Sequence, residues 1–285
     1  MQAAKTIFVT GATGNQGGAV VRNLLKKGFQ VKALIRNPST KAATAIAQKN
    51  VEIIKGDLND PASYQQHLDE ADGVFCNLSF NEGVEKEIRQ GIDLVTISKE
   101  KKVKHFVYSS VIGCDLNTGI PHWESKFTIE DHIKKTGIDF TIIRPSSLYE
   151  NFLLPQVKSR ILKNKLVLPT KKSTVQQFIS SEDIGRISTA IFSNPEKYIG
   201  RTLVLATEQM DGEQLAAIFS KALGKEIKFQ QLPMFIVRLV MGKGLSKMFR
   251  WINDNDAVFM KDTDGLRNEF PGMLSLEEWI KINFK

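Results

Sequence analysis

Two short stretches have residue types and spacing that suit chemistry: GATGNQG at residues 11–17 and HWESK at residues 122–126. The first is a glycine-rich turn between the strand-like TIFVT and a helix-like segment. Glycines at such a turn let backbone N–H groups and the positive end of the helix dipole approach a pyrophosphate without obstruction by Cβ atoms. The turn therefore predicts a phosphate cradle for a nucleotide. Its glycines are Gly11, Gly14 and Gly17.

The end of the second strand-like segment indicates which nucleotide this is. In VKALIRNPSTK, Arg36 stands where a protein that prefers NAD usually carries Asp or Glu for the ribose hydroxyls, and Lys41 follows closely. A guanidinium suits a 2′-phosphate through paired, charge-assisted hydrogen bonds, so we expect NADP(H). The alternative is an exposed arginine at a strand end. Asp57, after the third strand, is placed to meet the adenine, with a simple turn aspartate as the alternative.

Alternating strand-like and helix-like segments predict the elements that position these residues. Near-continuous apolar strands separated by helices indicate a parallel sheet covered on both faces. We expect an α/β fold, with a doubly wound parallel (Rossmann) sheet at residues 1–150 and a smaller mixed α/β C-terminal lobe at residues 151–285, interwoven with the sheet. The expected strands are 6–10, 31–36, 51–57, 73–78, 105–110 and 139–146, and the main helices are 19–28, 40–50, 85–101, 125–136 and one ending at Gly224.

Composition and charge indicate an ordinary globular protein of 285 residues, with 42% hydrophobic and 25% charged residues. The net charge of +8 is spread along the chain, which favours a cofactor with several phosphates over nucleic acid. The most basic stretch, Lys243–Arg250, has the spacing of a solvated helix face. The apolar runs are too short to span a bilayer and the N-terminus has no cleavage region, so we expect a cytoplasmic protein without a membrane role.

Cys76 and Cys114 are the only thiols, and they lack CxxC spacing. No histidine pair has the spacing of metal ligands either. We therefore expect buried free thiols, no disulfide framework and no metal site. The sequence leaves the oligomeric state open.

Taken together, these motifs resemble the NmrA-like family of atypical short-chain dehydrogenase/reductases, and the resemblance covers most of the chain. Its more specific parts are YSS at 108–110, HWESK, GIDFTIIRPSSLYENF at 137–152 and the later ISSEDIGRIS. Members of this family include quinone reductases, and also NADP(H)-binding redox sensors and transcriptional co-regulators. The resemblance implies an NADPH-dependent reductase of a quinone or conjugated carbonyl. The alternative is a non-catalytic sensor of the NADPH/NADP⁺ state that regulates a partner protein.

The resemblance also implies roles for individual residues. Lys126 would reach the nicotinamide ribose, and the loop from Pro145 to Phe152 would border the nicotinamide, with Tyr149, Asn151 and Phe152 as substrate contacts. Ser110 lies where the family places a catalytic serine, with a helix-cap or turn hydroxyl as the alternative. The remaining implied cofactor contacts are Gly11, Thr13, Gly14, Asn15, Gln16 and Gly17 at the pyrophosphate, Arg36 at the 2′-phosphate, Asp57 and Leu58 at the adenine, and Asn77, Leu78 and Ser79 near the ribose.

The HWESK stretch departs from the pattern of catalytic short-chain dehydrogenases, in which a tyrosine precedes the lysine by four residues. His122 stands at that position, and three interpretations stay open. His122 donates the proton itself; or Lys126 only binds ribose, and the proton comes from solvent or Tyr149; or no reaction occurs and the site reports which cofactor form is bound. The structural alternative for His122 is a helix-start residue with its ring on the surface.

Overall fold

The computed structural model describes residues 4–285, which divide into two compact units that interleave along the chain. The expected boundary at residue 150 lies close to one change of unit, but the chain returns to the first unit at residue 181. Unit 1 contains the residues up to Asp115, His122–Arg144 and Ser181–Leu203. Unit 2 contains Leu116–Pro121, Pro145–Ser180 and Val204–Lys285.

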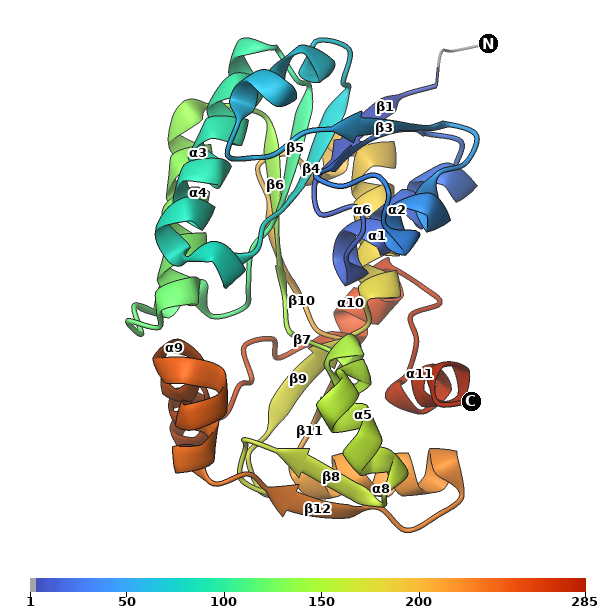
Figure 1. Cartoon of the computed structure of the whole chain (residues 1–285), viewed down its shortest axis with the longest axis vertical. Helices are drawn as coiled ribbons and strands as arrows, with labels where there is room; N and C mark the ends of the chain where they lie inside the picture. Colours follow the sequence, from blue (N-terminus) through green and yellow to red (C-terminus); the bar gives the residue numbers. More distant parts are fainter. Residues whose placement is uncertain (1–3) are drawn as a thin grey trace. The chain divides into compact units, whose positions relative to one another are not determined.

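A seven-stranded sheet with the order β10-β6-β5-β4-β1-β2-β3 forms the centre of unit 1 (Figure 1). All six predicted strands are present, and the pairs among them are parallel, which confirms the doubly wound α/β fold. The chain order reverses between β1 and β4, and ligands of such sheets bind outside the carboxyl ends of the strands at this point. The strands are β1 (Thr6–Val9), β2 (Gln30–Ile35), β3 (Val51–Lys55), β4 (Gly73–Asn77), β5 (His105–Ser109), β6 (Phe140–Pro145) and β10 (Thr202–Leu205).

Helices cover both faces of this sheet (Figure 1). On one face lie α1 (Asn15–Lys26), α2 (Lys41–Ile46) and α6 (Ser181–Ser193), and on the other lie α3 (Val84–Glu100) and α4 (Pro121–Thr136); α7 (Pro195–Tyr198) follows α6. Helix α4 begins four residues before the predicted start at Ser125, because a proline at the first helical position already has the helical φ angle. HWESK therefore lies within the first turns of α4.

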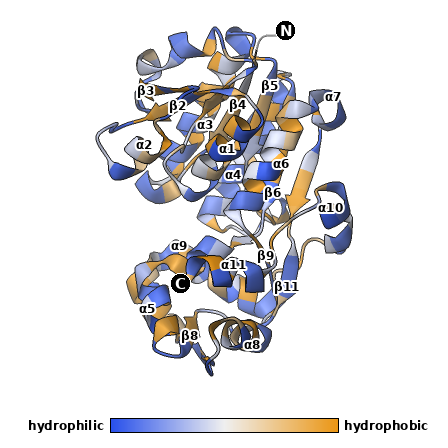
Figure 2. Ribbon diagram, turned by 90° about the vertical axis from the view of Figure 1, so that its right-hand side faces the viewer, coloured by the Kyte–Doolittle hydropathy of each residue, from blue (hydrophilic) through white to orange (hydrophobic). Residues whose placement is uncertain are grey.

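One hydrophobic cluster of unit 1 lies between the sheet and helices α3 and α4. Leu94 and Val95 of α3 and Ile129 and Ile133 of α4 pack on strand residues that include Phe106. In Figure 2 the hydrophobic colour gathers on the strands, whereas the peripheral helix α7 is hydrophilic. Strands buried on both faces explain why the strand segments are almost continuously apolar.

Unit 2 is the smaller mixed α/β part that the sequence predicts. A three-stranded sheet, β11-β9-β7, is antiparallel between β11 and β9 and parallel between β7 and β9, while β12 and β8 form a parallel pair. Helix α8 ends before Gly224 as predicted, with Gly224 in the left-handed conformation. Its elements are β7 (Ser147–Leu148), β8 (Lys165–Leu168), β9 (Gln176–Ile179), β11 (Glu208–Met210), β12 (Lys228–Gln231), α5 (Pro155–Leu162), α8 (Gly212–Leu223), α9 (Met234–Asn255), α10 (Thr263–Glu269) and α11 (Leu276–Asn283).

Short 3-10 helices and one long helix complete the description. Helix α9 contains the basic stretch Lys243–Arg250 and is kinked at Gly242, where the backbone leaves the helical conformation. None of the helices within residues 4–285 is long and apolar enough to cross a membrane. The 3-10 helices are η1 (Pro61–Ser63), η2 (Gln65–Leu68), η3 (Phe80–Glu82), η4 (Cys114–Leu116) and η5 (Tyr149–Leu153).

Candidate functional site

The glycine-rich turn between β1 and α1 is packed so closely that two of its positions have no room for a side chain. Gly11 has a φ of +63°, and a Cβ atom there would lie 3.0 Å from the side-chain nitrogen of Asn77. A Cβ atom on Gly17 would lie 2.2 Å from the carbonyl oxygen of Gly11. At these two positions the turn therefore presents backbone rather than a side chain.

The first turn of α1 has the features of an anion site. Gly14 is the N-cap residue and makes no side-chain capping bond, and the first turn contains no acidic residue. The Gly14 N–H donates to the carbonyl oxygen of Gly11 at 2.9 Å, which closes the turn. Backbone N–H groups at a helix start that no side chain caps attract a phosphate, and the helix dipole adds to this attraction.

Two hydroxyl side chains that sequence reasoning missed hold the turn in place. The Thr10 hydroxyl donates to the Asn77 carbonyl oxygen at 3.0 Å and accepts from the Asn77 N–H at 2.9 Å. The Ser109 hydroxyl donates to the side-chain oxygen of Gln16 at 2.7 Å. Both residues stand at the carboxyl ends of parallel strands, and that position is the signal that could have identified them.

A pocket of about 210 Å³ lies at the carboxyl ends of β1, β2, β3 and β4 in unit 1. It contains most of the residues predicted to bind the cofactor, while Gly14, Asn15, Gln16 and Gly17 belong to the adjoining turn. The predicted residues that line it are Gly11, Thr13, Arg36, Asp57, Leu58, Asn77, Leu78 and Ser79, and further lining residues include Thr10, Asn81, Glu82 and Gln90. The structure thus brings the ends of four strands together at one pocket.

Arg36 and Asp57 lie at the rim of this pocket and already have partners. The Arg36 guanidinium, whose side chain is 67% exposed, forms an ion pair with Glu82 of η3. One Asp57 carboxylate oxygen accepts from the Asn59 backbone N–H at 2.9 Å and from its side-chain amide at 3.0 Å. Asp57 therefore acts as a turn aspartate, which was the alternative to an adenine contact, and it also lines the pocket.

Lys126 is buried against a carboxylate that sequence reasoning missed. Its ammonium lies 2.9 Å from the carboxylate of Glu87 on α3, which is fully buried, and donates to the Leu78 carbonyl oxygen at 3.2 Å. The Ser125 hydroxyl donates to the other Glu87 oxygen at 2.5 Å. Because Leu78 lines the pocket, the lysine lies at the pocket boundary. A single acid on the buried face of a helix is the sequence signal for Glu87.

His122 is buried in unit 1 rather than exposed, so the structural alternative of a surface ring is wrong. Its ring stacks on Phe80, with centroids 4.7 Å apart, and only 8% of the residue is exposed. Burial is the main cause that lowers the pKa of His122 to about 4; Glu87 opposes this shift and Lys126 adds to it. The imidazole is therefore neutral at pH 7, and its remaining N–H is a much weaker acid than an imidazolium.

Ser110 lies beside one of the two free thiols, and its catalytic role stays a prediction. The Ser110 hydroxyl is buried, 3.5 Å from the Cys114 sulfur, and that sulfur donates to the Glu130 carboxylate at 3.1 Å. Cys76 and Cys114 are buried free thiols, and burial raises the pKa of each to about 12. Within residues 4–285, no group of three or more His, Cys, Asp or Glu side chains is arranged to hold a metal ion.

The predicted substrate contacts belong to unit 2, where two of them are core residues. The Tyr149 ring is fully buried and its hydroxyl donates to Glu208 at 2.5 Å; burial and this carboxylate raise its pKa. Phe152 packs on Phe178, with ring centroids 5.9 Å apart, whereas Asn151 is exposed. Pro145 is buried at the end of β6. Packing accounts for Tyr149 and Phe152, and their catalytic and substrate roles stay predictions.

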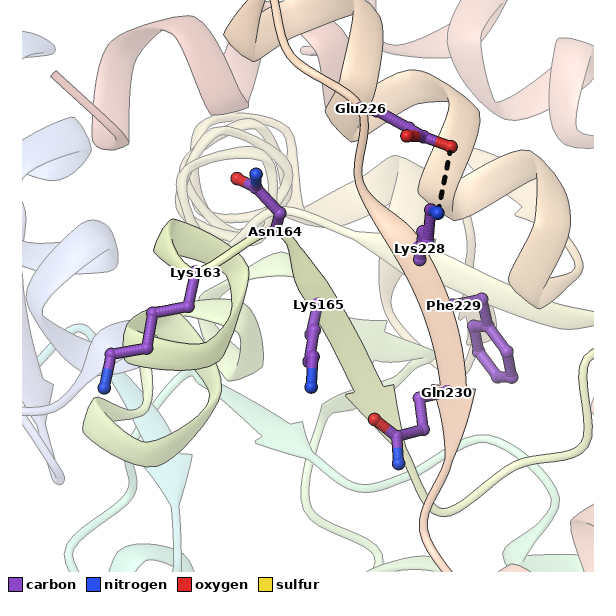
Figure 3. A pocket seen from close by; sticks show the side chains of 7 residues that line it. All are labelled: Lys163, Asn164, Lys165, Glu226, Lys228, Phe229 and Gln230. Carbon is purple, nitrogen blue, oxygen red and sulfur yellow. Dashed lines mark ion pairs between the residues drawn. The ribbon is translucent and has the colours of Figure 1, made fainter.

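A wider depression of about 470 Å³ lies over β8 and β12 in unit 2 (Figure 3). Lys165 and Lys228 are direct neighbours across the two strands, and Glu226 lies 3.7 Å from the Lys228 ammonium. The other lining residues are Lys163, Asn164, Phe229 and Gln230. The depression is a solvated basic face, larger than the pocket of unit 1 but without its chemistry.

The family profile described as the NmrA-like family matches residues 3–280, nearly the whole chain. The chain belongs to the NmrA-like family. A relative from Dictyostelium discoideum, an NmrA-like family domain-containing protein, is 28% identical over 99% of both chains. Two solved structures share the fold: the negative transcriptional regulator NmrA, in complex with NADP, and an Escherichia coli NADPH-dependent quinone oxidoreductase, in complex with NADPH.

The structural similarity extends along both whole chains. For the NmrA complex the TM-score is 0.80 at 22% identity, covering 99% of this chain and 96% of NmrA. For the quinone oxidoreductase the TM-score is 0.83 at 20% identity, covering 98% of this chain and all of the oxidoreductase. At these identities the similarity establishes the fold of this NmrA-like protein, and its chemistry depends on its own residues.

Proposed function

We propose that this NmrA-like protein binds NADP(H) and reduces a quinone or similar conjugated carbonyl. The observation that carries the proposal is the pocket of unit 1, in which a glycine-rich turn, an uncapped helix start and Arg36 lie at one edge of the sheet. Lys126 extends this arrangement, since it donates to a residue of the pocket wall and would hold a ribose hydroxyl. A cytoplasmic location without direct nucleic-acid contact is part of the proposal.

Reduction of a quinone would need little proton donation from side chains of the protein. Bound NADPH supplies a hydride, and the chain's residues hold the nucleotide and orient it. His122 is neutral at pH 7 because of its burial, so it is a weak proton donor there. A quinone accepts hydride readily and can take its proton from water, which favours a quinone over an unactivated ketone. The existence of a quinone oxidoreductase with the same fold supports this choice of substrate class.

A non-catalytic sensor is the second candidate, and one observation favours it. Both side chains considered as proton donors are buried and unsuited to donation: His122 is neutral, and the Tyr149 hydroxyl is bound to Glu208. A protein of this kind would bind the two cofactor forms with different affinities and regulate a partner protein. The solved negative transcriptional regulator with this fold supports the candidate.

Stopped-flow oxidation of NADPH against a panel of quinones and aldehydes separates the two candidates. We expect turnover with quinones, and its rate should show no inflection near pH 6.5 when pH is varied from 5.5 to 8. An inflection there would report an ordinary histidine, whereas the pKa of His122 is about 4. Turnover should be lost in the double variant Lys126→Met/Glu87→Leu, which removes both buried charges together. No turnover, combined with a large difference between the NADPH and NADP⁺ affinities, would support the sensor instead.

Arg36→Ala should weaken NADP(H) selectively. The guanidinium is the cation at the pocket rim, and a charged hydrogen bond to a phosphate contributes about 1.5–3 kcal/mol, or roughly a tenfold to hundredfold loss of affinity. NAD(H), which has no 2′-phosphate, should bind about as before. Calorimetric titration of the four cofactor forms measures this, and equal weakening of NAD(H) and NADP(H) would refute the assignment of Arg36 to the 2′-phosphate.

A further inference from the structure

Arg36, the cation predicted to bind the 2′-phosphate, already forms an ion pair with a carboxylate of the same unit. Glu82, the last residue of η3, pairs with Arg36, and both residues line the pocket. Their side chains are 37% and 67% exposed, so a ligand can reach both. The Glu82 carboxylate thus stands where an anionic group of the ligand would bind the guanidinium.

We propose that Glu82 is a specificity-determining residue that competes with the 2′-phosphate of NADP(H) for Arg36. The inference rests on the proposed function, because it concerns the same cofactor pocket. To bind a 2′-phosphate, the guanidinium gives up its carboxylate partner, whereas a ligand without this phosphate leaves the pair intact. Glu82 therefore lowers the preference for NADP(H) over NAD(H) that Arg36 alone would create.

Other partners near Glu82 make the exchange feasible. The second Glu82 oxygen lies 3.7 Å from the ammonium of Lys86 and 3.5 Å from the side-chain amide of Asn59. When a phosphate takes Arg36, the carboxylate keeps these two contacts and does not remain unpaired. Gly83 follows directly with a φ of +106°, a conformation that side-chain-bearing residues rarely adopt, so the backbone beside Glu82 is set by a glycine.

The site differs from an ordinary surface ion pair because of its position. Exposed pairs usually contribute little to stability, and replacing one member seldom changes the fold. Here the pair bridges the end of β2 and the segment after β4, both at the pocket. The free energy needed to break the Glu82–Arg36 pair is therefore subtracted from the affinity for a ligand that binds Arg36. This effect should become smaller as salt screens the charges.

Calorimetric titration with adenosine 2′,5′-bisphosphate and 5′-AMP tests the inference on the full chain. In Glu82→Gln we expect the bisphosphate to bind about fivefold tighter at low salt, the factor that corresponds to an exposed ion pair of about 1 kcal/mol. Affinity for 5′-AMP should change less than about twofold. The matched control is Glu85→Gln, which removes the same charge from an exposed acid three residues away, in the first turn of α3.

A second variant distinguishes competition between Glu82 and the phosphate for Arg36 from simple electrostatic repulsion between the Glu82 carboxylate and the phosphate. In an Arg36→Ala background, where the bisphosphate still binds through its adenosine and 5′-phosphate, the gain from Glu82→Gln should fall below about twofold. An undiminished gain in that background, an unchanged or weaker bisphosphate affinity in Glu82→Gln, or an equal gain for 5′-AMP would each overturn the inference. If the unaltered chain binds neither nucleotide, the proposed function fails instead.

Discussion

Glu87→Ala is expected to lower the free energy of unfolding by about 3–5 kcal/mol, the usual cost of leaving one member of a buried ion pair without its partner. The Glu87 carboxylate is fully buried, and the Lys126 ammonium lies 2.9 Å from it. The alanine variant leaves the lysine with the Leu78 carbonyl oxygen but without a counter-charge. Urea denaturation followed by circular dichroism measures the loss, as a lower midpoint at an unchanged slope.

The double variant Lys126→Met/Glu87→Leu is the matched control, because apolar residues of similar size often replace a buried ion pair at little cost. Ser125 loses its carboxylate acceptor in this variant but keeps the His122 carbonyl oxygen, 3.3 Å away. We expect stability near that of the unaltered chain together with loss of turnover. A Glu87→Ala variant as stable as the unaltered chain would show that the lysine leaves its buried position at no cost.

Gly17→Ala should reduce the affinity for NADPH and NADP⁺ by about a hundredfold or more, since a phosphate contact formed by several backbone N–H groups is lost as a unit. The new methyl group would lie 2.2 Å from the Gly11 carbonyl oxygen and 2.9 Å from the Ala12 nitrogen. Both atoms are backbone, so the turn itself must shift. Calorimetric titration measures the affinity, and thermal unfolding shows whether the fold remains intact.

Gly18→Ala provides the neighbouring control on the same helix. A Cβ atom at Gly18 would lie 3.3 Å from the Ala12 carbonyl oxygen, a contact that a shift of a few tenths of an ångström relieves. Alanine is also the better helix former by about 1 kcal/mol, so stability should be nearly unchanged or higher. Equal affinities for NADPH in the two variants and the unaltered chain would refute the phosphate site at this turn.

Two carboxylate contacts, one buried and one exposed, show how the cations of this pocket are held. Glu87 holds Lys126 at the pocket wall, and Glu82 holds Arg36 at the rim. Each cation that would meet a cofactor thus has an acid of α3 or of the segment before it as its partner. We therefore expect cofactor binding to depend on Glu82 and Glu87, which no cofactor motif of the sequence includes.

The strand pattern, the glycine turn and the family were accessible from the amino-acid sequence alone, because they depend on local regularities. Apolar strands, helix periodicity and glycine spacing are properties of contiguous residues, and they predicted six strands of the central sheet in their observed positions. The helix ending at Gly224 was predictable for the same reason.

Only the tertiary structure decided which side chains meet across elements. Glu87 reaches Lys126 from another helix, and Glu82 reaches Arg36 from another strand end, so no spacing along the chain reveals either pair. Burial decided the state of His122 in the same way, since Phe80 and the packing around it exclude water from the ring. Long-range packing sets charge partners and solvation, and these determine what the residues of a recognised motif can do.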